Sequence, residues 1–332
     1  MAKVAKPQST PELPEGDNAD QNKGESAKSE LTRMDLINAI SNGYGERSNS
    51  DSIKLCAKVI VDYLKQIVDT FPELINKYNI VVLNDENSIV PGDADKIYSA
   101  VTKFKNDKPL LLVLYSNGGF PGSAYLIGKL CLEYSNNNLA IVVPRHAKSA
   151  ATLLCCAARE IHMGSLSELG PIDPQIDSMP ALGLKNAVQH IAELVKSYPE
   201  ASEMFAKYLQ LSLPLINLGY YERAAESAEQ YAEQLLSIHG DILEGNPKEI
   251  AHRLVYNYKD HGFVIEKVEA KKIFGDIIKT NTEEYELGNQ LYIELDFIRT
   301  ISGIFNHNFY FIGSMETAST NFTKKQARKK QG

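Results

Sequence analysis

A serine at the start of an apolar helix is the first candidate for chemistry in this sequence. Ser149 follows the apolar run LAIVVP (139–144), which predicts a buried strand, and it lies in the segment RHAKSAATLLCCAA (145–158). The first amides of a helix have no intrahelical acceptor, and the positive end of the helix dipole favours a developing negative charge. A nucleophile at Ser149 would therefore have stabilising donors beside it.

A pair of glycines ends a second apolar strand, in LLLVLYSNGG (110–119). This run is apolar on both faces, which predicts an inner strand of a sheet. Glycines at its end let backbone N–H groups approach a substrate carbonyl, and two such donors form an oxyanion hole. We expect these donors around Gly118, Gly119 and Ala150.

Four ordered motifs at compact spacing carry a family resemblance. They are SNGG (116–119), VPRHAKSAATLL (143–154), EIHMG (160–164) and SELGPIDPQI (167–176). Over roughly 79–176 the chain resembles the serine dehydrogenase proteinases, relatives of the Clp proteases and of the signal peptide peptidase A type. The segment HGFVIEKVEAKKIFG (261–275) is similar to a turn-strand-helix element of the latter type.

The resemblance implies an α/β fold, a ClpP/crotonase-like spiral of βαβ units with flanking helices. It also implies a serine endopeptidase that cleaves peptides or proteins through an acyl-enzyme at Ser149, without a cofactor, and a homo-oligomer. Many relatives are membrane-attached. This sequence has no run near the roughly 20 apolar residues of a membrane span and no apolar signal core, so we expect no membrane span.

The general base is open. The resemblance to the Clp proteases places Asp173 about where their catalytic histidine lies, and an ordinary exposed carboxylate is a poor base for a serine hydroxyl. One solution is a desolvated lysine, as in the signal peptide peptidase type. Lys185 and Lys196 lie in the corresponding interval, and we take Lys185 as the candidate, with Asp173 orienting it or contacting substrate. Lys148 should point roughly a third of a helical turn away from Ser149.

The other solution is a histidine that forms a Ser/His/Asp triad with Asp173. His146 lies near the nucleophile in sequence, and His190 and His261 lie further along the chain. A triad needs the base within hydrogen-bond reach of the serine and a third group to orient the base. The sequence does not decide between these histidines and the lysines.

Simpler roles compete with the chemical ones. Ser149 is in a position where a serine often only caps a helix, Gly118 and Gly119 can form a tight turn, and Asp173 can be a turn residue. The alternative function is a catalytically weak or inactive pseudoprotease that acts as an oligomeric peptide-binding or scaffold module. A third possibility is an acyl-CoA hydratase of the same fold, but no adenine-recognition pattern is legible.

Composition excludes some classes of function. The chain has 332 residues, 43% of them hydrophobic, and 42 acidic against 35 basic residues, which gives a formal charge of -7 and no general nucleic-acid footprint. The basic run KKQARKK (324–330) is typical of a solvated tail. The four cysteines form no CxxC pair, which favours small core residues in a cytoplasmic protein. The spacing of His146, Cys155 and Cys156 fits no standard zinc pattern, so no metal is expected.

The pattern along the chain predicts five regions. We expect a disordered N-terminal tail (1–29), a helical N-terminal segment (30–78), a ClpP/crotonase-like protease domain (79–280) with a helical insertion (178–240), a C-terminal segment (281–320) and a basic disordered tail (321–332). Within the protease domain, strands are expected at 79–85, 110–116, 139–144 and 160–164 and helices at 93–104, 122–134, 148–158, 185–198, 200–213 and 220–240. The run 285–306 is ambiguous and shows no chemistry.

Overall fold

The computed structural model describes residues 30–176, 179–212, 215–317 and 319–324. The described residues from Leu31 onward form one compact unit. The predicted N-terminal tail (1–29) and the end of the basic tail (325–332) lie outside the described residues.

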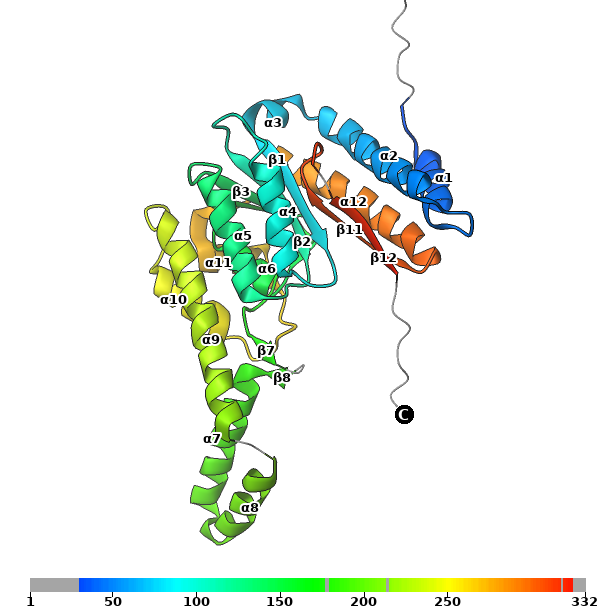
Figure 1. The fold of residues 1–332 in the computed structure, drawn as a ribbon. Helices are drawn as coiled ribbons and strands as arrows, with labels where there is room; N and C mark the ends of the chain where they lie inside the picture. Colours follow the sequence, from blue (N-terminus) through cyan, green and yellow to red (C-terminus); the bar gives the residue numbers. More distant parts are fainter. Residues whose placement is uncertain (1–29, 177–178, 213–214, 318, 325–332) are drawn as a thin grey trace, which may run out of the picture. The chain divides into compact units, whose positions relative to one another are not determined.

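A mostly parallel sheet forms the centre of this unit (Figure 1). Its main path has the order β10-β5-β3-β2-β1-β11-β12, in which neighbouring strands from β10 to β1 are parallel and β11 and β12 are antiparallel. The strands are β1 (Asn79–Asp85), β2 (Leu110–Ser116), β3 (Leu139–Val143), β5 (Glu160–Met163), β10 (Ile278–Lys279), β11 (His307–Gly313) and β12 (Ser319–Lys324). The four strands that the sequence predicts are confirmed, whereas β11 and β12 were not expected.

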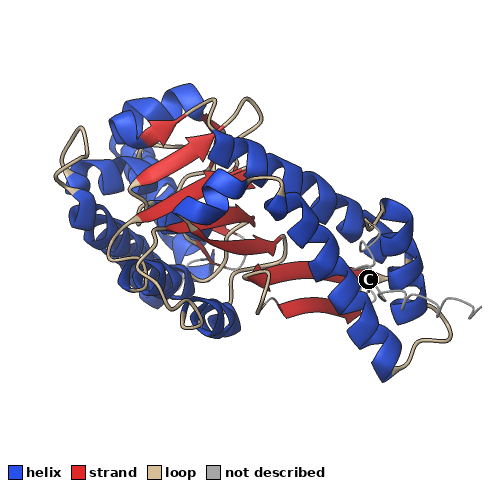
Figure 2. Cartoon of the chain, turned by 90° about the horizontal axis from the view of Figure 1, so that it is seen from above, coloured by secondary structure: helices blue, strands red, loops and turns tan. Residues whose placement is uncertain are grey.

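Helices cover both faces of this sheet (Figure 2). On β1, Val81 and Leu83 contribute to one core and Val82 to the other, because successive side chains of a strand point to opposite faces. The first core includes side chains of α4 (Pro91–Val101), α5 (Pro121–Glu133) and α6 (Ala150–Cys155). The second includes side chains of α1 (Arg33–Tyr44), α2 (Ser50–Asp69), α3 (Pro72–Lys77) and α12 (Glu283–Ile304). An inner sheet with two apolar faces is therefore confirmed.

Helices α4, α5 and α6 follow the parallel strands β1, β2 and β4, as the sequence predicts. The other described helices of the domain are α7 (Ala181–Ser197), α8 (Ser202–Ser212), α9 (Leu215–Leu236), α10 (Pro247–Tyr256) and α11 (Lys267–Phe274). Short 3-10 helices occupy Pro199–Ala201, Ser237–His239 and Gly275–Ile277. Ala225, Ala228 and Ala232 of α9 are buried in the first core, so this part of the expected insertion packs onto the domain.

Several sequence expectations need correction. The sequence also offers Asp51 and Ser52 as caps for the helix of the N-terminal segment, but α2 begins at Ser50 and its cap is Asn49, which accepts hydrogen bonds from the amides of Asp51 and Ser52. The ambiguous run 285–306 is almost entirely α12. β12 extends to Lys324, so the predicted tail (321–332) begins inside a strand.

The cysteines agree with a simpler expectation. Cys56, Cys131, Cys155 and Cys156 are buried and free, as expected of small core residues, and burial raises the pKa of Cys56 and Cys131 to about 12. Among the described residues, no helix has the length and apolar character needed to cross a membrane.

Three short strands extend the sheet beyond the carboxyl end of β2. β4 (His146–Ala147) pairs with β2 through Ala147 and Ser116, and β4 also pairs in parallel with β6 (Glu168–Leu169). β6 pairs antiparallel with β9 (Ile265–Glu266). The segment after β6 continues into the small hairpin of β7 (Gln175–Ile176) and β8 (Met179–Pro180). This extension holds the loops that carry the candidate site.

Candidate active site

Ser149 has an unusual backbone conformation directly before α6. Its φ is 51° and its ψ is -117°, a region that residues with a Cβ rarely adopt. Its side chain makes no capping hydrogen bond to the helix. The Ser149 hydroxyl therefore does not cap α6, and it is available for chemistry.

A set of hydrogen bonds holds the Ser149 turn in place. The amide of Lys148 donates to the Ser116 carbonyl at 3.0 Å, which joins the turn to the end of β2. The fully buried Thr152 hydroxyl donates to the Ala147 carbonyl at 2.7 Å and accepts from the Gly170 amide at 3.1 Å. The turn is thus fixed from both sides.

Two glycines follow β2 with positive φ angles of 102° at Gly118 and 145° at Gly119. Gly118 lies against the Ser149 turn, whereas Gly119 lies against Ile89. The Gly118 amide donates to the Ser116 hydroxyl at 3.1 Å. The amides of Gly119 and Ala150 have no hydrogen-bond acceptor among the described residues, and Ala150 is the first residue of α6. Ala150 directly follows Ser149, and Gly119 lines the same pocket as Ser149.

Asp173 and His261 lie on the two chain segments that flank the pairing of β6 with β9. Leu169 pairs with Ile265, and Asp173 lies four residues after Leu169 while His261 lies four residues before Ile265. His261 Nδ1 is 3.9 Å from Asp173 Oδ2. Asp173 is buried at 5% exposure, while the His261 side chain is partly exposed. The pair therefore has one buried anion and one accessible imidazole.

Ser149 and His261 line the same pocket, whose volume is about 640 Å³. Gly119 and Gln175 also line it, and Tyr231 closes it from α9. Gln175 Nε2 donates to Asp173 Oδ2 at 3.4 Å. The pocket thus brings together a serine, an imidazole beside a carboxylate, and a glycine amide.

The lysine candidates have different positions. Lys148 Nζ donates to the Leu169 carbonyl at 3.1 Å and lies 3.3 Å from Glu168 Oε2, so this ammonium is already bound. Lys196 is exposed in the last turn of α7. Lys185 is a residue of α7, but its side chain lies outside the described part of the structure.

The other histidine candidates do not line the pocket of Ser149. The ring of His146 packs on Tyr115 at a centroid distance of 4.4 Å, and burial lowers the pKa of this histidine. His190 is exposed on α7. His162 is buried on β5, with Nδ1 2.9 Å from the Thr282 hydroxyl, which agrees with a structural role.

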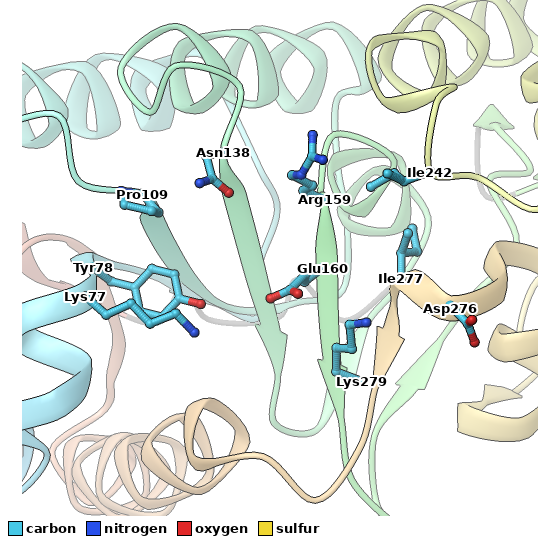
Figure 3. Close-up of a pocket in the computed structure, with 10 residues that line it drawn as sticks. All are labelled: Lys77, Tyr78, Pro109, Asn138, Arg159, Glu160, Ile242, Asp276, Ile277 and Lys279. Atoms are coloured by element: carbon cyan, nitrogen blue, oxygen red, sulfur yellow. The ribbon is translucent and has the colours of Figure 1, made fainter.

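A separate pocket of about 380 Å³ lies at the amino ends of the parallel strands (Figure 3). Figure 3 shows Glu160 at the start of β5 and Lys279 on the neighbouring β10. Ser149 instead follows the carboxyl end of β3, so the two pockets lie at opposite ends of the strands. The described residues contain no group of His, Cys, Asp and Glu side chains suited to hold a metal ion.

Comparison with protein families agrees with the motifs. Residues 85–200 match the model of the family described as ClpP-like SDH-type serine proteinase. All four motifs of the sequence resemblance fall inside this range. Two uncharacterized proteins of Methanocaldococcus jannaschii are each 27% identical to the chain, over 200 and 198 residues. The matches cover 60% and 59% of this chain and 64% and 61% of the relatives, which is less than two thirds of their length.

Two solved structures resemble part of the chain. A mutant of the 1510-N membrane-bound stomatin-specific protease is 13% identical with a TM-score of 0.38, and the match covers 61% of this chain and 79% of that protein. A second mutant of that protease, in complex with a substrate peptide, is 14% identical with a TM-score of 0.39, covering 61% and 75%.

Proposed function

We propose that the chain is a serine endopeptidase that forms an acyl-enzyme at Ser149, because residues 85–200 match the model of the ClpP-like SDH-type serine proteinase family. The observation that carries the proposal is the shared pocket of Ser149 and His261, with Asp173 beside the imidazole. A serine, a base and a group that orients the base are the parts that acyl transfer needs.

In the proposed reaction, Ser149 Oγ attacks the carbonyl carbon of a peptide bond while His261 takes the hydroxyl proton. The tetrahedral intermediate then collapses, the C–N bond breaks, and His261 returns the proton to the leaving amine. Water, activated by the same imidazole, hydrolyses the acyl-enzyme. Asp173 holds the imidazole and stabilises its charged form. The 3.9 Å contact is longer than a hydrogen bond, and we propose that it tightens when substrate binds.

The amides of Gly119 and Ala150 are the proposed oxyanion donors. Both lack an acceptor among the described residues. Ala150 directly follows Ser149, and Gly119 lines the same pocket as Ser149. An oxyanion hole works because its donors are in place before charge develops. Gly118 then has a supporting role, since its own amide is bound to Ser116 and its lack of a side chain allows the close approach.

Lys185 remains the rival base in this proposal. A lysine base would need its ammonium to lose a proton in a desolvated position near Ser149. The described contact between His261 and Asp173 favours the histidine. Substitution of Lys185 or of His261 distinguishes the two candidate bases.

The proposal also covers the substrates, the assembly and the location of the protein. Peptides or proteins are the expected substrates, by resemblance to the family, and so is a homo-oligomeric assembly. The four free, buried cysteines are compatible with a reducing compartment, which supports a cytoplasmic location.

Reaction with a fluorophosphonate probe tests the proposed nucleophile without knowledge of the substrate. The wild-type protein should be labelled at Ser149, as mapped by mass spectrometry of the digested protein, and Ser149→Ala should not be labelled. Absence of labelling in folded wild-type protein at every pH between 6 and 9 would contradict the peptidase and favour the pseudoprotease.

A further inference from the structure

A polar cluster behind the candidate site connects α12 to the loop of the two glycines. Arg299 Nη1 of α12 lies 2.9 Å from Glu86 Oε1, and the guanidinium lies over the Tyr115 ring at 5.2 Å from its centroid. The Tyr115 hydroxyl also donates to Glu86 Oε1. Burial, together with this hydrogen bond, raises the pKa of Tyr115 above its ordinary value, so the phenol keeps its proton. We call Arg299, Glu86 and Tyr115 the Arg299 cluster.

The cluster contacts residues 116–119, which we call the proposed oxyanion loop, at two points. Tyr115 directly precedes Ser116, whose carbonyl and hydroxyl hold Lys148 and Gly118. The Asn117 side chain donates to the Glu86 carbonyl at 2.7 Å. The residue that contributes the free amide, Gly119, follows two positions later. A change in the position of Glu86 or Tyr115 would therefore be passed to this amide.

The cluster also touches the loop of the nucleophile. The ring of His146 packs on Tyr115 at 4.4 Å, and His146 precedes Ser149 by three residues on the same loop. Tyr115 is thus in contact with the segments that carry the serine and the amide donor. Tyr115 is itself in contact with Arg299 of α12.

We propose that Arg299 is a positioning residue for the active site: its ion pair with Glu86 and its contact with Tyr115 fix the distance between Ser149 and the amide of Gly119. Arg299 does not contact the pocket of Ser149, so it acts only through the cluster. Small displacements of reacting groups have large effects on rate, which makes such support functionally significant. The inference rests on the proposed function for its kinetic readout only.

The test compares Arg299→Ala with Arg33→Ala. Arg33 is the control because it likewise joins α12 to another element: it pairs with Glu294 of α12 at 2.7 Å and lies over the ring of Phe297 at 4.9 Å. Arg299→Ala should lower kcat on a peptide substrate by about 10- to 100-fold. KM should stay within about threefold, because substrate binding is not removed. Arg33→Ala should leave both constants unchanged. An equal loss in both variants, or an unchanged kcat in Arg299→Ala, would overturn the proposal.

Chemical rescue sharpens the test. Arg299 and Glu86 line a pocket of about 330 Å³, so a small cation can reach the space that the missing side chain leaves. Guanidinium at millimolar concentration, far below denaturing levels, should restore part of the kcat of Arg299→Ala and leave the Arg33→Ala variant unaffected. Arg299→Lys should retain more activity than Arg299→Ala, because it keeps the charge but not the fork of two donors. Failure of both rescues would also count against the proposal.

Amide hydrogen exchange tests the positioning without any reference to peptidase activity. Segments 110–120 and 145–150 should lose protection in Arg299→Ala, whereas Arg33→Ala should preserve it. If wild-type protein is not labelled by the fluorophosphonate, the proposed function fails and this comparison still decides the role of Arg299. Equal protection of both segments in the two variants would refute it, and Arg299→Lys replaces Arg299→Ala if the latter does not fold.

Discussion

Gly118 lies so close to Ser149 that a Cβ added to the glycine would be 2.9 Å from the Ser149 Cβ. It would also be 2.6 Å from the Lys148 carbonyl oxygen, and the φ of Gly118 is 102°. The proposed oxyanion loop and the nucleophile turn therefore touch at a point where only glycine fits.

The substitution Gly118→Ala should separate these two segments. We expect the rate of fluorophosphonate labelling to fall by about 100-fold, since the donors lose their position, and the free energy of unfolding to fall by about 1–3 kcal/mol. Urea unfolding and labelling kinetics measure the two effects. Gly92→Ala is the control, because its added Cβ has no neighbour within 4 Å. Wild-type labelling in Gly118→Ala would contradict the close contact.

Ser149→Gly should abolish labelling and stabilise the protein. A glycine adopts positive φ without the penalty that a Cβ brings, so relief of the strain at φ 51° should raise the free energy of unfolding by about 1 kcal/mol. Ser149→Ala keeps the strain and loses no capping bond, so its stability should match wild type. Thermal unfolding of the three proteins checks this order. Equal stability of the glycine and alanine variants would mean that the turn is not strained.

The base is identified by the pH dependence of labelling. A base must be unprotonated to accept the proton of Ser149, so activity should rise with pH as the base loses its own proton. His261→Ala should remove the activity, while Lys185→Ala should keep both the rate and the profile. If Lys185→Ala is the inactive variant and the rise lies at higher pH, the lysine is the base.

Asp173→Asn tests the orienting carboxylate. By analogy with triad aspartates, we expect turnover to fall by about 10,000-fold, because an amide does not stabilise the imidazolium. The Asp276→Asn variant, on an exposed carboxylate, should behave as wild type. A loss of thermal stability with nearly full turnover would instead assign Asp173 to the turn alone.

The acid stability of the fold should depend on His239. This histidine is 1% exposed, with Nε2 3.0 Å from the Ala157 carbonyl, and burial lowers its pKa despite that contact. The unfolded chain then takes up the proton first, at about pH 6.5. Stability is therefore complete above this pH and falls as the pH drops through it toward the lower folded pKa, by up to about 1.4 kcal/mol per pH unit.

The urea midpoint between pH 7.5 and 5 measures this effect. His239→Gln, which offers the Ala157 carbonyl another donor, should flatten the dependence. His252→Gln, at a side chain that is 58% exposed, should not change it. An unchanged slope in His239→Gln would contradict the prediction.

The sequence predicts the parallel strands well because a strand that is buried on both faces is a continuous apolar run, and such a run is visible in the sequence. β2 is found at 110–116, where a run that is apolar on both faces contributes to both cores. α12 was missed as a helix. Its Gly288 lowers helix propensity, yet a Cβ there would be 2.3 Å from a Val142 methyl, so the glycine serves close packing on the sheet.

The sequence places the proposed nucleophile but leaves the proposed base open. Ser149 lies between a strand and a helix that are adjacent in sequence, so a short stretch of residues is enough to place it. His261 reaches Asp173 through β6 and β9, and each of these strands has only two residues, too few to show a period. Arg299 was missed for a similar reason, because its role depends on contacts with Glu86 and Tyr115, which are remote in sequence.

The C-terminal strands have a further consequence for the state of the protein in solution. β11 pairs with β1, a strand in which all seven residues are buried, and β12 then forms the outer edge of the sheet. Without β11, the unpaired N–H and C=O groups of this apolar strand would be a template for pairing with other chains. The hairpin of β11 and β12 therefore protects the sheet against aggregation, independently of any catalytic role.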